Sequence, residues 1–299
     1  MKEFDELFTK PNEEIKTDDK RPFDKDAWAE KKKQERAEAY ALLDEATKEA
    51  AEDPEKFRDY LNVQARFDRY SVSNALLISH QKFDATKLCD YMTWNKEGVN
   101  VEKGEKSILI LEPGNEYTRD DGSKAFSVNT KRVFDISQTT AKDKQRKPKT
   151  PDPRSAIKAL IEAAPCPIVM DNEVTKNVLA IYSPDKSTIY IRQGMDANDI
   201  FKSLSQEVVI ARYAGKDYDR KDCAFFAYCA SFILCERNGF DTGDFNFDRV
   251  PERYDGADLK KIRSDMMNIR DMTNDVTRDM IRQFEAMEKT KQLRDKGAR

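Results

Sequence analysis

The sequence holds a single histidine, His80, among 299 residues, and this scarcity limits the metal chemistry open to the chain. A mechanism that draws two or three imidazole ligands from one chain is excluded. The five cysteines are odd in number and form no CxxC pair, so neither a disulfide framework nor a cysteine zinc site is indicated. We therefore expect buried free thiols, no metal and no other cofactor. The cysteines are Cys89, Cys166, Cys223, Cys229 and Cys235.

Long apolar runs are also missing. No segment approaches the roughly 20 apolar residues that cross a bilayer. The first 20 residues are acidic and polar, whereas a secretory signal is basic and then apolar. We therefore expect a cytoplasmic protein without a membrane partner. The ten glycines are thinly spread, and the chain has no P-loop, no dinucleotide fingerprint and no Gly-x-Ser-x-Gly elbow, which argues against nucleotide-driven and acyl-transfer chemistry.

An excess of positive charge is the third feature that the chain lacks. Its 53 Lys and Arg are outnumbered by 56 Asp and Glu, for a net charge of -3. The molecule therefore offers no uniformly basic surface of the kind that binds duplex DNA, and any nucleic-acid site must be local. Mean hydropathy is low, at -0.83, yet 16 Phe and 11 Tyr supply material for folded cores.

A chain of this length has room for two domains of ordinary size, each with its own core. We expect two small α+β modules joined by a basic, proline-containing linker, with a charged N-terminal helix and a long C-terminal amphipathic helix. The predicted divisions are a charged lead-in that is partly disordered and then helical (residues 1–52), a first module (53–140), a linker (141–154), a second module (155–255) and a C-terminal helix (256–299).

Helix and strand signals support this plan in the first half. Residues 24–51 are rich in helix-forming and charged residues. Asp53 followed by Pro54 is a good start for the next helix, and the pattern fits either its continuation or a restart through residues 73–79. Strand patterns follow at residues 107–111 and 132–136, with a turn at 120–122.

The sequence also indicates the linker and the elements of the second half. Residues 141–154 contain three prolines, six Lys or Arg, and two Asp. Beyond it we expect one helix, three strands and two further helices, the last ending at Gly239. From residue 259 onward, apolar residues recur at three- and four-residue spacing, which favours core packing or self-association of a long helix. The expected elements are a helix at 155–164, strands at 168–170, 178–182 and 188–191, and helices at 196–213 and 222–238.

Spaced residues between positions 66 and 139 form a specific pattern. It consists of Tyr70-Ser71-x-x-Asn74-x-x-Leu77-Ile78-x-x-Gln81, Ala85, Trp94, Gly98, Val101-x-x-Gly104-Glu105-Lys106, Ile108, Ile110, Pro113 and Val133-Phe134-Asp135-Ile136-Ser137-Gln138-Thr139. In order, spacing and identity this pattern resembles the N-terminal domain of the ArdC antirestriction family and the LtrC-like proteins of conjugative elements. One departure is Phe83, where the family pattern often has proline.

The resemblance implies binding of single-stranded DNA. Such sites combine aromatic faces that stack on bases with cations that follow phosphates, and amide groups can bond to base edges. Candidate stacking residues are Tyr70, Trp94 and Phe134. Candidate phosphate contacts are Arg66, Arg69, Lys103, Lys106 and Arg132. Candidate amide contacts are Asn74, Gln81 and Gln138.

Each of these assignments has a structural alternative. Trp94 and Phe134 are also typical of a core. The turn at residues 103–106 is equally well a charged hairpin tip, and Asn74 and Gln81 share a helix face that could brace the helix against the sheet. Residues 58–140 carry twelve Lys or Arg and twelve Asp or Glu. DNA binding is therefore expected to be modest, with stacking supporting the phosphate contacts.

In the second module, the resemblance extends to zinc peptidases. Residues 203–212 occupy the place of the helix that carries His-Glu-x-x-His in that family, where two imidazoles four residues apart share one face. In the corresponding positions this chain has Gln206, Glu207 and Ile210, and Phe226 and Tyr228 stand where a third ligand is expected. The resemblance therefore implies a peptidase-like scaffold without metal and without catalysis.

The sequence thus predicts a non-enzymatic single-stranded-DNA-binding protein, acting as an accessory or antirestriction protein of a conjugative or mobile element. The alternative is an interaction or inhibitor protein that engages a host restriction, defence or conjugation component without holding DNA. The sign of the surface charge between residues 70 and 106 distinguishes the two. A residual hydrolase would require a metal.

Overall fold

A computed structural model describes residues 24–144, 150–214 and 219–297. It is an α+β structure with two small sheets, a charged N-terminal helix and a long C-terminal helix, which confirms the expected fold class. The expectation of disorder before the first helix falls on residues 1–23 and so lies outside the described residues. No helix among the described residues is both long and apolar enough to cross a membrane.

Side-chain caps set the starts of the first three helices, α1 (Lys25–Glu52), α2 (Pro54–Arg66) and α3 (Val72–Lys82). Asp24 caps α1, and Asp53 caps α2, with Pro54 at its first position. Ser71 accepts a hydrogen bond from the backbone N–H of Asn74 and starts α3 as a separate helix. Each cap satisfies backbone donors that the first turn leaves unpaired.

The first sheet is antiparallel, with the strand order β1 (Leu88–Cys89), β3 (Lys124–Asp135), β2 (Ile108–Thr118). The hairpin of β2 and β3 extends further than the sequence pattern predicts. A register shift between Pro113 and Glu116 accommodates the proline and glycine that read as a strand end. The short helix α4 (Tyr91–Lys96) and the 3-10 turns η2 (Ile136–Gln138) and η3 (Lys142–Lys144) complete this half.

The second half follows the expected order of elements closely. Its sheet is mixed, since β4 (Ile168–Met170) runs parallel to β6 (Thr188–Ile191), and β5 (Ala180–Ser183) runs antiparallel to it. Gly239 adopts the left-handed conformation, with φ of 76°, and ends α7. The helices are α5 (Pro153–Glu162), α6 (Ala197–Tyr213), α7 (Arg220–Asn238), α8 (Val250–Tyr254) and α9 (Leu259–Gly297).

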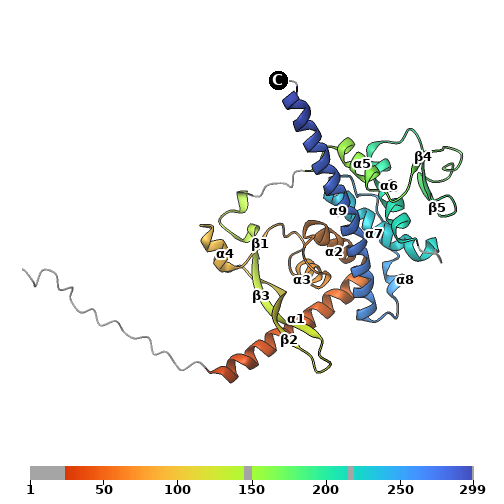
Figure 1. The fold of residues 1–299 in the computed structure, drawn as a ribbon. Helices are drawn as coiled ribbons and strands as arrows, with labels where there is room; N and C mark the ends of the chain where they lie inside the picture. The colour runs from red at the N-terminus through yellow and green to blue at the C-terminus, as the bar shows by residue number, and fades with distance from the viewer. Residues whose placement is uncertain (1–23, 145–149, 215–218, 298–299) are drawn as a thin grey trace, which may run out of the picture.

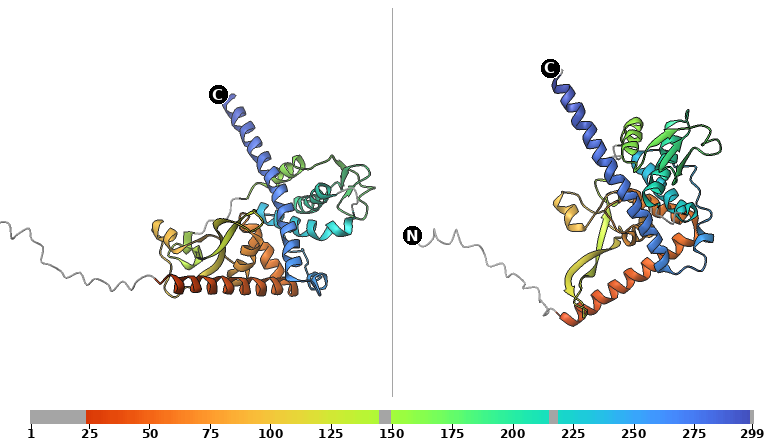
Figure 2. Two further views of the ribbon diagram at one scale, coloured as in Figure 1. Left: turned by 60° about the horizontal axis from the view of Figure 1, so that its bottom comes forward. Right: turned by 45° about the vertical axis from the view of Figure 1, so that its right-hand side comes forward.

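Helix α9 connects the two halves. It contacts α1 and α3 of the first half and α5, α6 and α7 of the second. Figures 1 and 2 show it running between the two sheets, with its C-terminal end projecting beyond the body of the protein. The amphipathic helix predicted from residue 259 onward is therefore a packed element over most of its length, with Ile262, Met266, Ile269, Val276 and Met280 buried.

Buried apolar side chains from both halves form one continuous cluster. Phe57 of α2 illustrates the continuity, because its ring lies 6.0 Å from that of Phe225 and 5.5 Å from that of Phe247, centroid to centroid. The two halves therefore share a core, whereas the sequence predicted one core for each. The boundaries drawn at residues 53–140 and 155–255 stay a prediction. A smaller cluster forms around Trp94, Ile136 and Ala141.

The predicted linker is structured at both ends. Ala141 is buried in the smaller cluster, and Asp152 caps α5 with Pro153 at the first position of that helix. Residues 145–149, in the middle of the predicted linker, lie outside the described residues. All five cysteines are free thiols; Cys229 and Cys235 are buried, and the other three are half-buried.

Candidate nucleic-acid interface and the metal-site positions

Two of the predicted DNA-contacting amides bind the sheet instead. Asn74 donates to the carbonyl of Leu111 and accepts from its N–H, each at 2.8 Å. Gln81 bonds the backbone of Leu109 in the same two-way manner, at 2.9 and 2.8 Å. Strand β2 is an edge strand of its sheet, so the two side chains satisfy backbone groups that have no neighbouring strand. The alternative in which they brace α3 against the sheet is the correct one.

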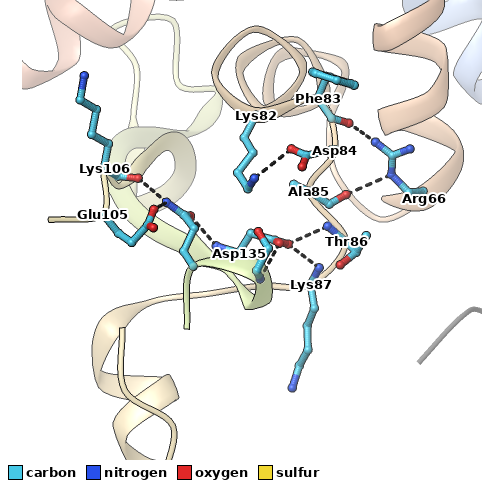
Figure 3. A network of polar contacts seen from close by, with 12 residues as sticks. Arg66, Lys82, Phe83, Asp84, Ala85, Thr86, Lys87, Glu105, Lys106 and Asp135 are labelled. Carbon is cyan, nitrogen blue, oxygen red and sulfur yellow. Dashed lines mark hydrogen bonds and ion pairs between the residues drawn. The ribbon is translucent and has the colours of Figure 1, made fainter. Parts of the chain in front are cut away.

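Gln138 also has a structural position. Its oxygen accepts from the backbone N–H of Asp135 at 2.9 Å, while its nitrogen donates to the carboxylate of Glu105 and the carbonyl of Lys106. Asp135 is fully buried and accepts from the backbone N–H groups of Thr86 and Lys87. Figure 3 shows this network joining the loop after α3 to the turn at residues 103–106. The motif from Val133 to Thr139 therefore fixes two loops.

The guanidinium of Arg66 is committed to the same loop. It donates to the carbonyl of Ala85 at 3.0 Å and to that of Phe83 (Figure 3). Partial burial lowers the pKa of Arg66 from its usual range. A side chain that holds two loop carbonyls has little freedom to follow a phosphate, so the guanidinium of Arg66 serves the loop.

Of the three predicted stacking residues, Trp94 is too deeply buried to stack on a base. Its indole is 1% exposed and donates to the carbonyl of Phe134 at 3.0 Å. This is a correction to the stacking role, because a base needs an open ring face. Phe134 packs beside it and is half-buried. Tyr70 is also half-buried, in the loop between α2 and α3, and burial raises its pKa.

The remaining candidates are accessible. Lys103, Lys106 and Arg132 are exposed, and so is Arg69. Lys106 belongs to the turn that Gln138 holds, and Arg132 contacts Ser107 beside it at 3.3 Å. The structure therefore brings Lys103, Lys106 and Arg132 to one edge of the first sheet. Among the described residues, the ammonium groups of Lys103 and Lys106 have no ion-pair partner, and Arg132 has only a 3.9 Å contact with Glu38.

Other surface residues were missed by the sequence analysis. Tyr91 and Met92 of α4 are 52% and 64% exposed, and Phe83 is 54% exposed. Lys131 on β3 pairs with Asp90 at 3.1 Å and with Glu112 at 3.7 Å. In the sequence, α4 is marked only by Asp90 before the aromatic Tyr91. Its six residues are too few to show a helical period.

At the metal-site positions, Glu207 forms an ion pair with an arginine. Glu207 is 2% exposed, and Arg220 donates to both of its carboxylate oxygens, to one of them at 2.9 Å. The same carboxylate accepts from the backbone N–H of Tyr182 at 2.7 Å, which ties α6 to β5. Glu207 and Arg220 therefore form an ion pair whose carboxylate is buried.

The other two ligand positions do not fit a metal. Ile210 is fully buried, and its hydrocarbon side chain offers no lone pair. The amide of Gln206 faces a cavity of about 940 Å³ that is also lined by Tyr228 of α7. Within the described parts of the chain, no group of three or more His, Cys, Asp or Glu residues is placed to hold a metal ion. The donor set at these positions therefore does not match a metallopeptidase centre.

Comparison with known proteins relates part of this chain to a known family. Residues 41–151 match the family described as the N-terminal domain of anti-restriction factor ArdC. The metal-free crystal structure of the antirestriction ArdC protein from plasmid R388 aligns at a TM-score of 0.54 and 16% identity, over 81% of this chain and 98% of that chain. Its Mn(II)-bound structure aligns at 0.51 and 16%, over 74% and 97%. No curated protein sequence matches the chain.

At 16% identity, the two R388 structures show that this chain shares their α+β fold. Residues 41–151 are similar in sequence to the ArdC N-terminal domain. The resemblance predicted from the sequence is thereby confirmed. The Mn(II) ion was found in the R388 protein. Whether this chain can hold a metal depends on its own residues at the same positions.

Proposed function

We propose that this protein binds single-stranded DNA through its first half and serves as an accessory or antirestriction protein of a conjugative or mobile element. The match of residues 41–151 to the ArdC N-terminal domain is the observation that carries the proposal. The surface chemistry gives it support. Exposed Lys103 and Lys106 stand beside Arg132, and unpaired cations of this kind attract phosphates.

The turn at residues 103–106 is well suited to a strand backbone. Gly104 has φ of 92°, a conformation that side chains disfavour, and a Cβ at this position would meet no atom within 4 Å. The turn is fixed from below by Gln138, so its two lysines are presented on a rigid base. Half-exposed Phe134 and Tyr70 are the predicted rings that retain accessible surface in this half.

We propose further that the second half acts without metallopeptidase chemistry. Support comes from the residues themselves: an isoleucine and a glutamine stand at the two histidine positions, and Arg220 holds the glutamate. Metal analysis of purified protein after exposure to Zn²⁺ or Mn²⁺ tests this half of the proposal. Stoichiometric metal retained through dialysis would contradict it.

A fluorescence-anisotropy titration tests DNA binding. The full chain is titrated with a labelled 20-nucleotide single strand and with the matching duplex, at two salt concentrations. We expect tighter binding to the single strand and weaker binding at high salt. Each lost phosphate contact should reduce the log-log salt slope by about 0.7, so Lys103→Glu combined with Lys106→Glu should reduce it by about 1.4.

The matched control is Lys56→Glu combined with Lys158→Glu, which makes the same charge change at exposed lysines outside this turn. Equal weakening by both double variants would show that only net charge matters. Equal, weak affinity for single strand and duplex would contradict the proposal. That outcome would favour a protein-binding role, which agrees with the pairing of Lys87 and Lys131 with carboxylates on this half.

A further inference from the structure

The cavity next to Gln206 is the feature of the second half that the proposed function leaves unused. It measures about 940 Å³, which is the upper end of the size range of small-molecule sites. Helices α7 and α8 and the segment between them supply most of its wall. Its lining residues are Gln206, Lys221, Ala224, Phe225, Tyr228, Asn246, Phe247, Arg249, Val250, Glu252 and Arg253.

The floor of the cavity is aromatic. Phe225, Tyr228 and Phe247 contribute rings, and Tyr228 packs on Phe247 with 5.8 Å between centroids. The hydroxyl of Tyr228 accepts a hydrogen bond from the backbone N–H of Asn246 at 2.7 Å, so its own proton remains available to a ligand. Burial raises the pKa of this hydroxyl, which therefore stays protonated at neutral pH.

The rim is basic. Lys221, Arg249 and Arg253 line the cavity together with the carboxylate of Glu252, to which Arg249 donates at 3.1 and 3.3 Å. Arg253 lies 4.1 Å above the ring of Phe225 and is 3.8 Å from Asp265, a distance longer than a hydrogen bond. Lys221 has no ion-pair partner among the described residues. The amide of Gln206 likewise makes no hydrogen bond within the described part of the chain.

An aromatic floor, a cationic rim and an amide that is not bonded to other described residues together select a ligand with three matching parts. A flat ring fits among the aromatic side chains and the guanidinium of Arg253. An anionic group fits the rim, where Lys221 and Arg249 can reach it. Polar ring edges fit the amide of Gln206. A purely apolar ligand would leave the rim unused, and a simple anion would leave the floor unused.

We propose that this cavity binds a nucleotide, with its base on the aromatic floor and its phosphate at the basic rim. Two sources share that chemistry: a free nucleoside monophosphate and the phosphorylated end of a strand. The cavity is separate from the exposed turn at residues 103–106. Nucleotide binding there can therefore be tested independently of DNA binding by the first half.

Calorimetric titration of the full chain with dAMP tests the proposal, alongside deoxyadenosine and ribose 5-phosphate. We expect dAMP to bind, and each fragment to bind about tenfold more weakly or worse, because each lacks one half of the contacts. Lys221→Glu combined with Arg249→Glu should weaken dAMP binding at least about tenfold. Glu252→Gln should tighten it, because it removes the one carboxylate of the rim.

The control is Lys158→Glu, an exposed lysine on α5 outside the cavity, which should leave dAMP binding unchanged. Ala224→Phe should block the floor; if this variant fails to fold, the rim variants still decide, because they change exposed side chains. No binding of dAMP to the unmodified protein at millimolar concentration would overturn the proposal. Equal competition by inorganic phosphate would also overturn it, since the rings would then contribute nothing.

Displacement of dAMP by single-stranded hexanucleotides identifies the source. A 5′-phosphorylated hexanucleotide that competes, where the 5′-hydroxyl form does not, assigns the site to strand ends. Competition by neither form, with dAMP still bound, assigns it to free nucleotides. Both results agree with a nucleotide site. Repeating the competition with the Lys103→Glu and Lys106→Glu double variant shows whether the oligonucleotide acts at the cavity or at the turn in the first half.

Discussion

Several polar residues of the family pattern serve the fold before any ligand. Asn74 and Gln81 act as a substitute strand on the open edge of β2, and Gln138 closes a capping box with Asp135. The sequence predicted their amides as DNA contacts because free amides form hydrogen bonds with bases. Here, both the donor and the acceptor of each amide are used by the protein. What remains for a ligand is a set of exposed cations.

Asn74→Asp tests the bracing role. The change keeps the acceptor for the N–H of Leu111 but replaces the donor with a charged oxygen facing the Leu111 carbonyl. We expect the free energy of unfolding to fall by about 2–3 kcal/mol, measured by urea denaturation. Asn100→Asp makes the same chemical change at an exposed position and should cost little. Equal stability of the two variants would refute the bracing role.

Asp90 gives a prediction for pH. Hydrogen bonds from the backbone N–H of Thr93 and from Lys131 lower its pKa to about 2. Because the folded pKa is depressed, the stabilisation is present above the unfolded value of about 3.9 and is lost as pH falls through about 2. Asp90→Ala should therefore cost about 1 kcal/mol at pH 7, the usual value of an N-cap.

The stability difference between Asp90→Ala and the unmodified protein should shrink as pH falls from 4 to 2. Urea denaturation at a series of pH values measures it. Asp90→Asn keeps an oxygen for the cap and should differ less at pH 7. A difference that stays constant down to pH 2 would mean that the carboxylate charge contributes nothing.

At the scale of elements, the sequence predicted those that start with a clear cap and follow a clear period. Asp53 and Pro54 marked α2, Gly239 marked the end of α7, and strands β4 and β6 have the predicted bounds. The length of β2 was not predictable from Pro113 and Gly114, because the bulge that absorbs them depends on pairing with β3. Helices α4 and α8 were too short to show a period.

The candidate site was predictable only in part, for a related reason. Exposure of Lys103 and Lys106 follows from a glycine turn, which is local. The burial of Trp94 and the partners of Asn74 depend on contacts with residues about 40 positions away. Likewise, the absence of histidine at positions 206 and 210 was visible from the sequence. The pairing of Glu207 with Arg220 was not visible, because it requires α6 and α7 to be placed together.

Helices α6 and α7 depend on that buried ion pair. Arg220→Met leaves the carboxylate of Glu207 buried without its arginine, while it still accepts from the N–H of Tyr182. We expect a loss of about 3–5 kcal/mol in the free energy of unfolding, the usual cost of breaking a buried pair. Glu207→Gln combined with Arg220→Met removes the stranded charge and should recover much of the loss. A double variant as unstable as the single one would show that the charge is not the cause.

For the whole molecule, the shared core and α9 predict that the two halves unfold together. Arg237 of α7 is central to this coupling: it donates to the carbonyls of Gln64 and Ala65 in α2 and to Asn274 and Thr277 in α9. Burial lowers its pKa to about 10, so it remains charged at neutral pH, held by those oxygens. One guanidinium therefore links three helices that come from both halves of the sequence.

Coincident unfolding transitions measure this coupling. Both tryptophans, Trp28 and Trp94, lie in the first half, so their fluorescence reports that half, while far-ultraviolet circular dichroism reports all the helices. We expect the two signals to follow one curve in urea. Arg237→Leu should lower the midpoint of both signals by the same amount, with a loss of about 2–4 kcal/mol, because it leaves the carbonyls of Gln64 and Ala65 without their donor. If fluorescence kept its midpoint while circular dichroism shifted, the halves would be independent and the shared core would not be cooperative.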